Sequence, residues 1–137
     1  MPTDLIPVTF NKIMQAQSYT VIILGTESKK FAIYTEPTVG RNIQLYLTEE
    51  HKPRPYTHDL IHSIFDGLEI KVMQVVINNV EDTIYFARIF LEQTIGDERR
   101  ILEIDARPSD SVTIALMHNA PLFCKKEVLE KAVPVED

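Results

Sequence analysis

Six short runs of β-branched and aromatic residues predict β-strands along the chain. They lie at 7–14, 19–25, 30–35, 70–78, 83–92 and 100–106. Three runs come close together near the N-terminus, and three more follow after a long interval, so the strands fall into two groups. The stretch after each group carries apolar residues at a different spacing, which indicates helices.

Four helices are predicted, two after each group of strands. Three start at a hydroxyl residue that we expect to cap the helix N-terminus, namely Thr38, Thr57 and Ser109. The fourth lies near the C-terminus and carries Val128, Leu129 and Ala132. The apolar faces of the first three consist of Val39, Ile43, Tyr46, Leu47, Leu60, Ile61, Ile64, Phe65, Leu68, Val112, Ala115 and Leu116. Between the third and fourth helices, the sequence predicts a connection at 119–121.

An offset of 71 residues (102 − 31) relates two parts of the chain. It places 31–34 on 102–105, Pro37 on Pro108 and Ile43 on Ile114. The offset is too long for a solenoid repeat and occurs only once. We therefore predict one α+β domain over residues 1–137, made of two β-β-β-α-α halves. The halves, at about 8–66 and 72–132, are expected to form a curved mixed sheet with helices packed on it.

Composition narrows the functional classes. The chain has 137 residues, 45% of them hydrophobic, a net charge of −6 and a pI of about 5.2. This length suits a single domain with a real core. The acidic balance argues against an extended basic surface, which is the usual feature of tight nucleic-acid binding. Any nucleic acid is therefore expected to bind locally or through a metal ion.

The cysteine content and the N-terminal residues bear on the cellular location. Cys124 is the single cysteine, so an intrachain disulfide is excluded. The stretch 1–4 has neither a basic nor an apolar signal region, and the longest apolar runs are too short to cross a bilayer. We expect a cytoplasmic protein that does not bind membranes.

Two polar clusters lie at the start of predicted helices, and each contains Arg, Pro, a hydroxyl and Asp. The first, at 54–60, holds Arg54, Thr57, His58 and Asp59. The second, at 104–111, holds Asp105, Arg107, Ser109 and Asp110. Polar groups at a helix N-terminus meet free backbone N–H donors and the positive end of the dipole, where an anion or a metal-bound phosphate is favoured.

The same residues have a purely structural interpretation. Thr57 and Ser109 are then helix caps, Asp59 and Asp110 complement the helix dipoles, and Arg107 pairs with an aspartate. His58 is exposed in this interpretation. Residue types alone leave both interpretations open.

A zinc peptidase is disfavoured, although two histidines share a helix face. His58 and His62 are four residues apart, but Asp59 replaces the usual glutamate and no third ligand is evident. His51 and His118 are expected at the surface.

The second cluster continues to Phe123, and with the first it resembles the bifunctional nuclease family. Members of this family carry similar "RPxTHDL" and "DaRPSDAiaLA…aPI" signatures. The likeness runs from about residue 19 to 132, with a matching strand at 72–77 and a matching stretch at 84–88. Two separated motifs in the right order are more specific than any single short pattern. The resemblance implies an activity that cleaves DNA and RNA.

Two hypotheses follow for the function. The first is a small nuclease with metal-assisted phosphodiester hydrolysis, whose two clusters approach each other. In it, Asp59, Asp105 and Asp110 hold Mg²⁺ or Mn²⁺ and His58 moves a proton. The residues expected to contact the substrate are Arg54, Thr57, Arg107 and Ser109. The alternative is a non-catalytic binding or regulatory module, a homodimer, in which the motifs are turns and caps.

Overall fold

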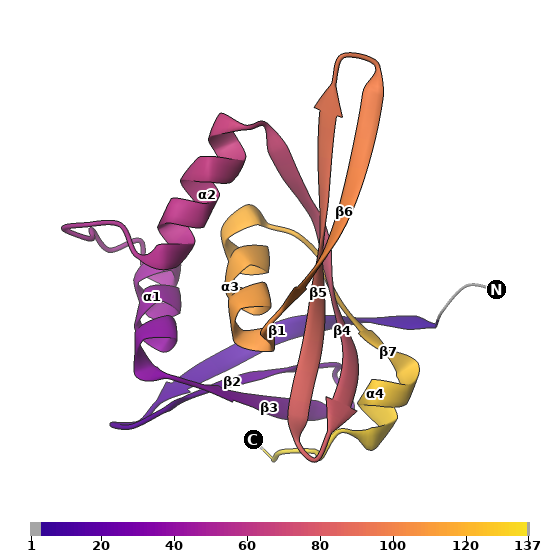
Figure 1. Ribbon diagram of the computed structural model, residues 1–137. Coiled ribbons are helices and arrows are strands. Elements are labelled where there is room, and N and C mark those ends of the chain that lie inside the picture. Colours follow the sequence, from indigo (N-terminus) through magenta and orange to yellow (C-terminus); the bar gives the residue numbers. More distant parts are fainter. Residues whose placement is uncertain (1–3, 137) are drawn as a thin grey trace.

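A seven-stranded mixed sheet with four helices makes up the α+β fold (Figure 1). The computed structural model describes residues 4–136. In chain order the elements are β1 (Leu5–Gln15), β2 (Thr20–Gly25), β3 (Lys30–Thr35), α1 (Pro37–Leu47), α2 (Thr57–Gly67), β4 (Ile70–Glu81), β5 (Ile84–Ile95), β6 (Glu98–Ala106), α3 (Pro108–His118), β7 (Leu122–Lys125) and α4 (Lys126–Lys131). The α+β class predicted from the sequence is confirmed.

The sheet consists of two antiparallel three-stranded sets joined through β7. The strand order is β3-β2-β1-β7-β4-β5-β6, with β7 antiparallel to β1 and parallel to β4. The two sets run in clearly different directions, so the sheet is strongly curved, and α3 lies in the angle between them (Figure 1). All six predicted strands are present. The seventh, β7, was missed because four residues are too few for a recognisable alternation.

The central helix α3 is buried almost all around its circumference. Six of its residues are buried, and they follow one another closely: Ser109, Ser111, Val112, Thr113, Ile114 and Ala115. Two of the hydroxyls among them bond back to the helix, from Ser111 Oγ to the Arg107 carbonyl and from Thr113 Oγ1 to the Ser109 carbonyl. These bonds satisfy polar groups that would be costly to bury unpaired. The helix therefore serves as core for both sets of strands.

The helices start earlier than their hydroxyl residues predict, so the three expected caps are wrong. The residues at the N-cap are Glu36, Tyr56 and Arg107. Proline follows Glu36 and Arg107, and its fixed φ angle favours the first helical position, which starts the helix before Thr38 or Ser109 is reached. In α2, Asp59 accepts a hydrogen bond from the Tyr56 backbone N–H at 2.7 Å.

The two parts of the chain agree in the order of their first four elements. Helices α1 and α3 start at Pro37 and Pro108, the positions that the 71-residue offset aligns. The second part departs from the predicted β-β-β-α-α order, because β7 is inserted between α3 and α4. Whether the halves superpose stays a prediction. Among the described residues, no helix has the length and apolar character needed to cross a membrane.

Candidate functional site

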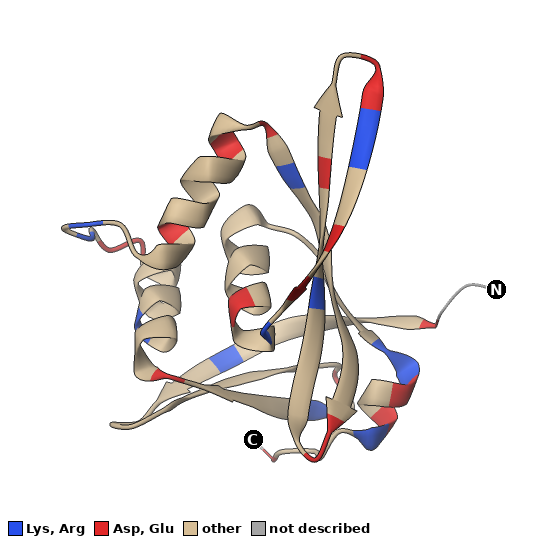
Figure 2. Ribbon diagram, viewed as in Figure 1, with Lys and Arg blue, Asp and Glu red and all other residues tan. Residues whose placement is uncertain are grey.

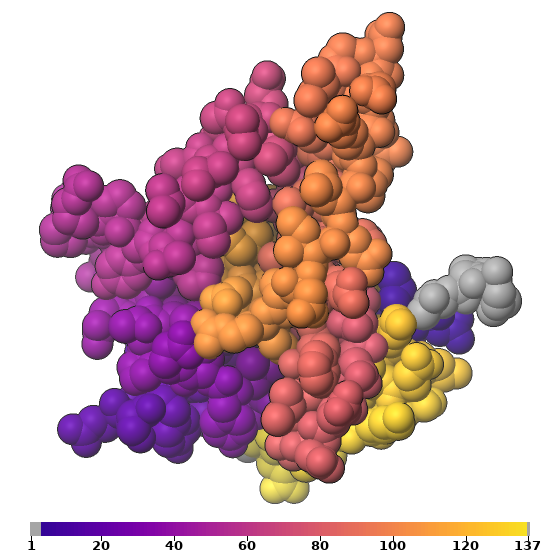
Figure 3. Space-filling view, viewed as in Figure 1, coloured from indigo at the N-terminus to yellow at the C-terminus, as the bar shows by residue number. Residues whose placement is uncertain are grey.

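A cavity of about 840 Å³ opens between α2, the end of β6 and the start of α3. Figure 3 shows the hollow between α2 and the β5–β6 hairpin, with α3 behind it. Its wall is largely apolar. The polar residues that line it are Glu36, Thr38, Tyr56, Thr57, His58, Asp105, Arg107 and Asp110. They come from the N-terminal ends of α1, α2 and α3 and, for Asp105, from the end of β6, so residues of both polar clusters meet here.

His58 and Asp110 join the two clusters directly. His58 Nε2 lies 2.8 Å from Asp110 Oδ1. His58 is 6% exposed, so the exposed histidine of the purely structural interpretation is wrong. The side chain is buried because the first turn of α2 packs against α3.

Two residues that the sequence analysis did not identify, Lys52 and Asn42, determine which nitrogen of His58 carries the hydrogen. The Lys52 ammonium, which only donates, bonds to Asn42 Oδ1. The amide nitrogen of Asn42 must therefore face His58 Nδ1, at 3.3 Å. Because an amide NH₂ only donates, Nδ1 accepts, and the hydrogen of the neutral ring lies on Nε2. His58 thus donates to Asp110, and both ring nitrogens are occupied.

Arg107 bridges two carboxylates at the mouth of the cavity. Its guanidinium contacts Asp110 Oδ2 at 2.9 Å and Glu36 Oε1 at 2.8 Å. The hydrogen bond from His58 and then those from Arg107 lower the pKa of Asp110 to about 2. Arg107 lowers the pKa of Glu36 to about 2 as well, and both carboxylates raise the pKa of Arg107. Asp110 and Glu36 are therefore ionised at neutral pH.

Asp59 does not line the cavity, in contrast to its predicted role. Its carboxylate lies 2.8 Å from Lys52 Nζ and accepts the Tyr56 N–H. Burial alone would raise the pKa of Asp59, but these two donors lower it. Asp59 therefore holds Lys52, which in turn orients Asn42.

The other predicted residues are divided between the cavity and its surroundings. Thr57 and Asp105 line the cavity, and the Asp105 carboxylate is largely exposed, 3.9 Å from Arg88 Nε. Arg54 is exposed and does not line it. Ser109 is buried in the first turn of α3 and lines a separate, smaller cavity of about 390 Å³. The structure therefore brings together His58, Thr57, Asp105, Arg107 and Asp110.

The expected three-aspartate metal site does not fit this arrangement. Within residues 4–136, no three His, Cys, Asp or Glu side chains are grouped as a metal ion requires. Both Asp110 oxygens are taken by His58 and Arg107, and Asp59 is paired with Lys52. An ion at these aspartates would have to compete with a fixed guanidinium and a fixed ammonium.

Three residues of the site were missed, namely Glu36, Asn42 and Lys52, and the last two left little trace in the sequence. Asn42 lies beside apolar helix positions, and Lys52 lies in a proline-containing loop, where a lysine is unremarkable. Glu36 had a signal, because the 71-residue offset aligns it with Arg107, its ion-pair partner.

Elsewhere in the described part of the chain, the charged residues form no single basic face. Figure 2 shows Lys and Arg dispersed over most elements and interspersed with Asp and Glu. The cavity itself has three carboxylates, Glu36, Asp105 and Asp110, and one guanidinium. A single chain therefore offers little positive potential to a phosphate backbone.

Comparison with known proteins gives a family match and distant relatives. A family model described as "Bifunctional nuclease domain" matches residues 21–136. An uncharacterized protein of Mycobacterium tuberculosis is 28% identical over 123 residues, which cover 88% of this chain and 71% of the relative. Bifunctional nuclease 1 of Oryza sativa subsp. indica and Bifunctional nuclease of Oryza minuta are each 25% identical over 76 residues. That match covers 56% of this chain but 23% of the rice proteins.

Proposed function

The chain belongs to the bifunctional nuclease domain family, and on this premise we propose that it hydrolyses phosphodiester bonds of DNA or RNA at the cavity. The observation that carries the proposal is the meeting of His58 with Asp110 across 52 residues of sequence, beside Arg107. Two motifs that are remote in sequence serve one site only if they converge. The names of the rice relatives support the same activity.

The polar residues of the cavity differ in how far their existing hydrogen bonds leave them available to a substrate. Arg107 lies at the mouth of the cavity and is half exposed, so its planar fork can exchange Glu36 for a phosphate oxygen. Asp105 is the cavity carboxylate with no hydrogen-bonded cation, since Arg88 is 3.9 Å away. We assign it the role of accepting the proton of the attacking water. His58 and Asp110 act as positioning residues that fix Arg107.

A second candidate function is a non-catalytic binding module. It is favoured by one observation, which is that His58, Asp110 and Arg107 satisfy one another inside a largely apolar cavity. This hydrogen-bonded arrangement can be explained without any catalytic activity.

Cleavage assays separate the two candidates. We expect purified protein to cleave single-stranded DNA or RNA, and Asp105→Asn and Arg107→Lys to lose activity by roughly a hundredfold, as when one charge-stabilising group is removed. Arg54→Ala is the matched control, because Arg54 lies outside the cavity and should leave the rate unchanged. All variants are purified identically and checked by circular dichroism. A wild type without activity, or an Asp105→Asn variant at full activity, favours the binding module.

The metal requirement predicted from the sequence is a separate arm of this assay. Cleavage is measured with Mg²⁺, with Mn²⁺ and after treatment with a chelator. Cleavage that survives the chelator supports hydrolysis by the side chains alone. Loss of cleavage with the chelator supports a divalent ion bound at the cavity carboxylates.

A further inference from the structure

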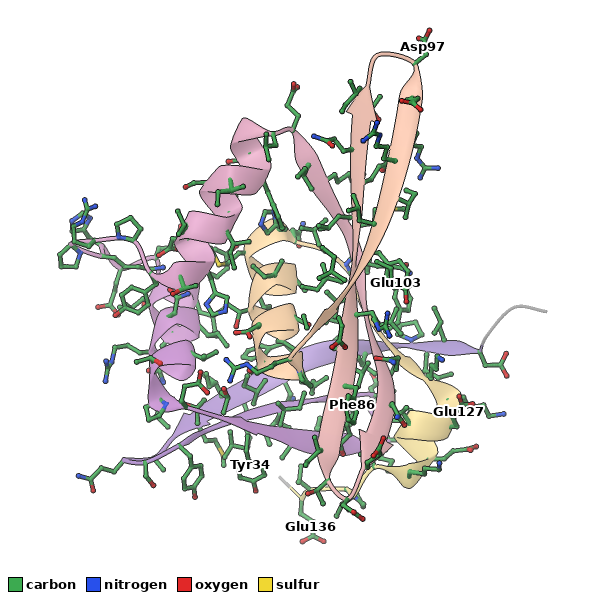
Figure 4. The ribbon with its side chains drawn as sticks, viewed as in Figure 1. Tyr34, Phe86, Asp97, Glu103, Glu127 and Glu136 are labelled. Carbon is green, nitrogen blue, oxygen red and sulfur yellow. The ribbon has the colours of Figure 1, made fainter. Side chains whose placement is uncertain are left out.

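Strand β6 is an unusually exposed edge of the sheet. Among the described strands it pairs with β5 alone, and eight of its nine residues are exposed. Its apolar residues Ile101, Leu102 and Ile104 are 48%, 43% and 41% exposed. The β5–β6 hairpin projects beyond the rest of the molecule in Figure 1, and Figure 4 marks Asp97 at its tip. A long apolar edge strand of this kind is a template for pairing with another chain.

The charges of β6 are ordered along its length. Arg99 and Arg100 lie toward the hairpin tip, and Glu103 and Asp105 lie toward the cavity. Parallel pairing of two copies in register would set arginine against arginine. Antiparallel pairing with Leu102 opposite Leu102 sets Arg99 of each copy opposite Asp105 of the other. Opposite charges at directly facing positions stabilise a strand pair, and like charges destabilise it.

From this self-complementary edge, we propose that β6 pairs antiparallel with β6 of a second copy, about a two-fold axis at Leu102. The interface is the same surface on both copies, as closed two-fold dimers require. It covers Ile101, Leu102 and Ile104 and extends the sheet continuously through both subunits.

The pairing also changes the cavity. In this register, Arg100 of the partner subunit lies opposite Ile104, a residue of the cavity wall. Directly opposed residues share a face of the sheet, so the partner subunit's Arg100 lies at the side of the cavity. The dimer thus supplies a second cation to a cavity whose own guanidinium, Arg107, is paired with Glu36 and Asp110. This consequence rests on the proposed function, whereas the dimer does not.

Disulfide trapping tests the register. Leu102→Cys is expected to give a covalent dimer on mild oxidation, because side chains at a two-fold between antiparallel strands come within disulfide reach. Ile84→Cys is the matched control, since Ile84 is exposed at the far end of β5 and should not cross-link. The native Cys124 does not compete, because it is buried and burial raises its pKa to about 12.

Charge reversal tests the pairing in solution by analytical ultracentrifugation. The wild type should be a dimer, and Arg99→Glu or Asp105→Arg should each weaken the dimer at least about tenfold. The double variant should restore it, because the opposed charges are exchanged. A monomeric wild type at about 100 μM, or a dimer that Leu102→Cys does not trap, overturns the proposal. These readouts need no nuclease activity, so failure of the proposed function leaves them intact.

The contribution of the partner to the cavity has its own readout. Arg100→Gln should lower the affinity for a single-stranded oligonucleotide at least about tenfold and leave the dimer, measured by ultracentrifugation, in place. Each Lys or Arg that contacts phosphate also steepens the salt dependence of binding, so this variant should show a shallower dependence. Unchanged affinity and salt dependence in a dimeric Arg100→Gln variant would remove Arg100 from the site.

Discussion

At the scale of single residues, the site is organised by what each side chain can donate. Lys52 offers only donors, so it fixes the orientation of the Asn42 amide, and the amide fixes which nitrogen of His58 carries the hydrogen. His58 therefore donates to Asp110 with no lone pair left for the cavity. A histidine near neutral pH is usually a candidate proton carrier. Here its neighbours make it a support for Asp110.

Asp110 is the residue whose removal should cost most in this network. Asp110→Asn is expected to lower the free energy of unfolding at pH 7 by about 1–3 kcal/mol, because the charge-assisted hydrogen bonds from His58 and Arg107 weaken. The folded pKa of about 2 lies below the ordinary 3.8. The carboxylate therefore stabilises the fold above about pH 4, and this contribution is lost as the pH falls toward 2.

Urea unfolding at several pH values checks this prediction. The difference between wild type and Asp110→Asn should be largest near pH 7 and shrink toward pH 2. The control is Asp97→Asn at the hairpin tip, which should change stability by less than about 0.5 kcal/mol. An equal difference at pH 7 and pH 2 would show that the effect is not due to ionised Asp110.

The sequence predicted part of this network for a physical reason. His58 and Asp110 both lie in the first turn of a helix that follows a proline-containing segment, and such turns can be recognised from local residues alone. Asn42 comes from α1 and Lys52 from the loop between α1 and α2, and both meet residues of α2 there. That contact depends on the path of the chain rather than on any local pattern, so it was not foreseen.

At the scale of elements, helices α2 and α3 meet through a pair of histidines. His62 Nδ1 and His118 Nε2 are 3.2 Å apart, and Asp66 Oδ2 lies 3.3 Å from His62 Nε2. The Phe65 ring also lies against His118, with 5.7 Å between the ring centroids. Burial, followed by the neighbouring His62, lowers the pKa of His118 below its usual 6.5, and Asp66 opposes this in part. His118, expected at the surface, is half-buried in this helix contact.

This helix contact should make the fold sensitive to mild acid. Because the folded chain binds the His118 proton less readily than the unfolded chain, stability falls as the pH drops through about 6.5. His118→Gln removes this titration and should flatten the dependence of the unfolding midpoint on pH between 7.5 and 5.5. His51→Gln is the control, since His51 is exposed in a loop. The unfolding midpoint of both variants is measured by thermal unfolding at each pH. If the two midpoints changed equally with pH, this role of His118 would be contradicted.

Strands could be predicted from the sequence where their residues pack against the core and so form a regular apolar pattern. The strands carry dense apolar runs, and their existence was predicted correctly, but β5 and β6 extend three and two residues further than expected, through polar positions such as Thr94 and Glu98. Those positions lie in the projecting hairpin, where neither face is covered and the hydrophobic pattern fades. Strand β7 is defined by its two neighbours in the sheet, which no local window contains.

At the scale of the whole molecule, β7 holds the two sets of strands together. Leu122 pairs with Val8 of β1 and with Val75 of β4, so one buried residue belongs to both ladders. Helix α3 packs on strands from both sets, β3 on one side and β4 and β5 on the other. Two halves that share a central strand and a central helix have one core. They are therefore expected to unfold together, even if they descend from a duplication.

Leu122→Ala tests this coupling. Truncating a buried leucine lowers the free energy of unfolding by about 2–5 kcal/mol. Leu122 is buried in β7, the strand that pairs with both halves, so both should be destabilised. We expect a single urea transition in which circular dichroism and tyrosine fluorescence shift together to a lower midpoint. Leu60→Ala is the matched control, because Leu60 is exposed on α2 and the same truncation there leaves no buried cavity. Two separate transitions, only one of them moved by Leu122→Ala, would mean that each half has a core of its own.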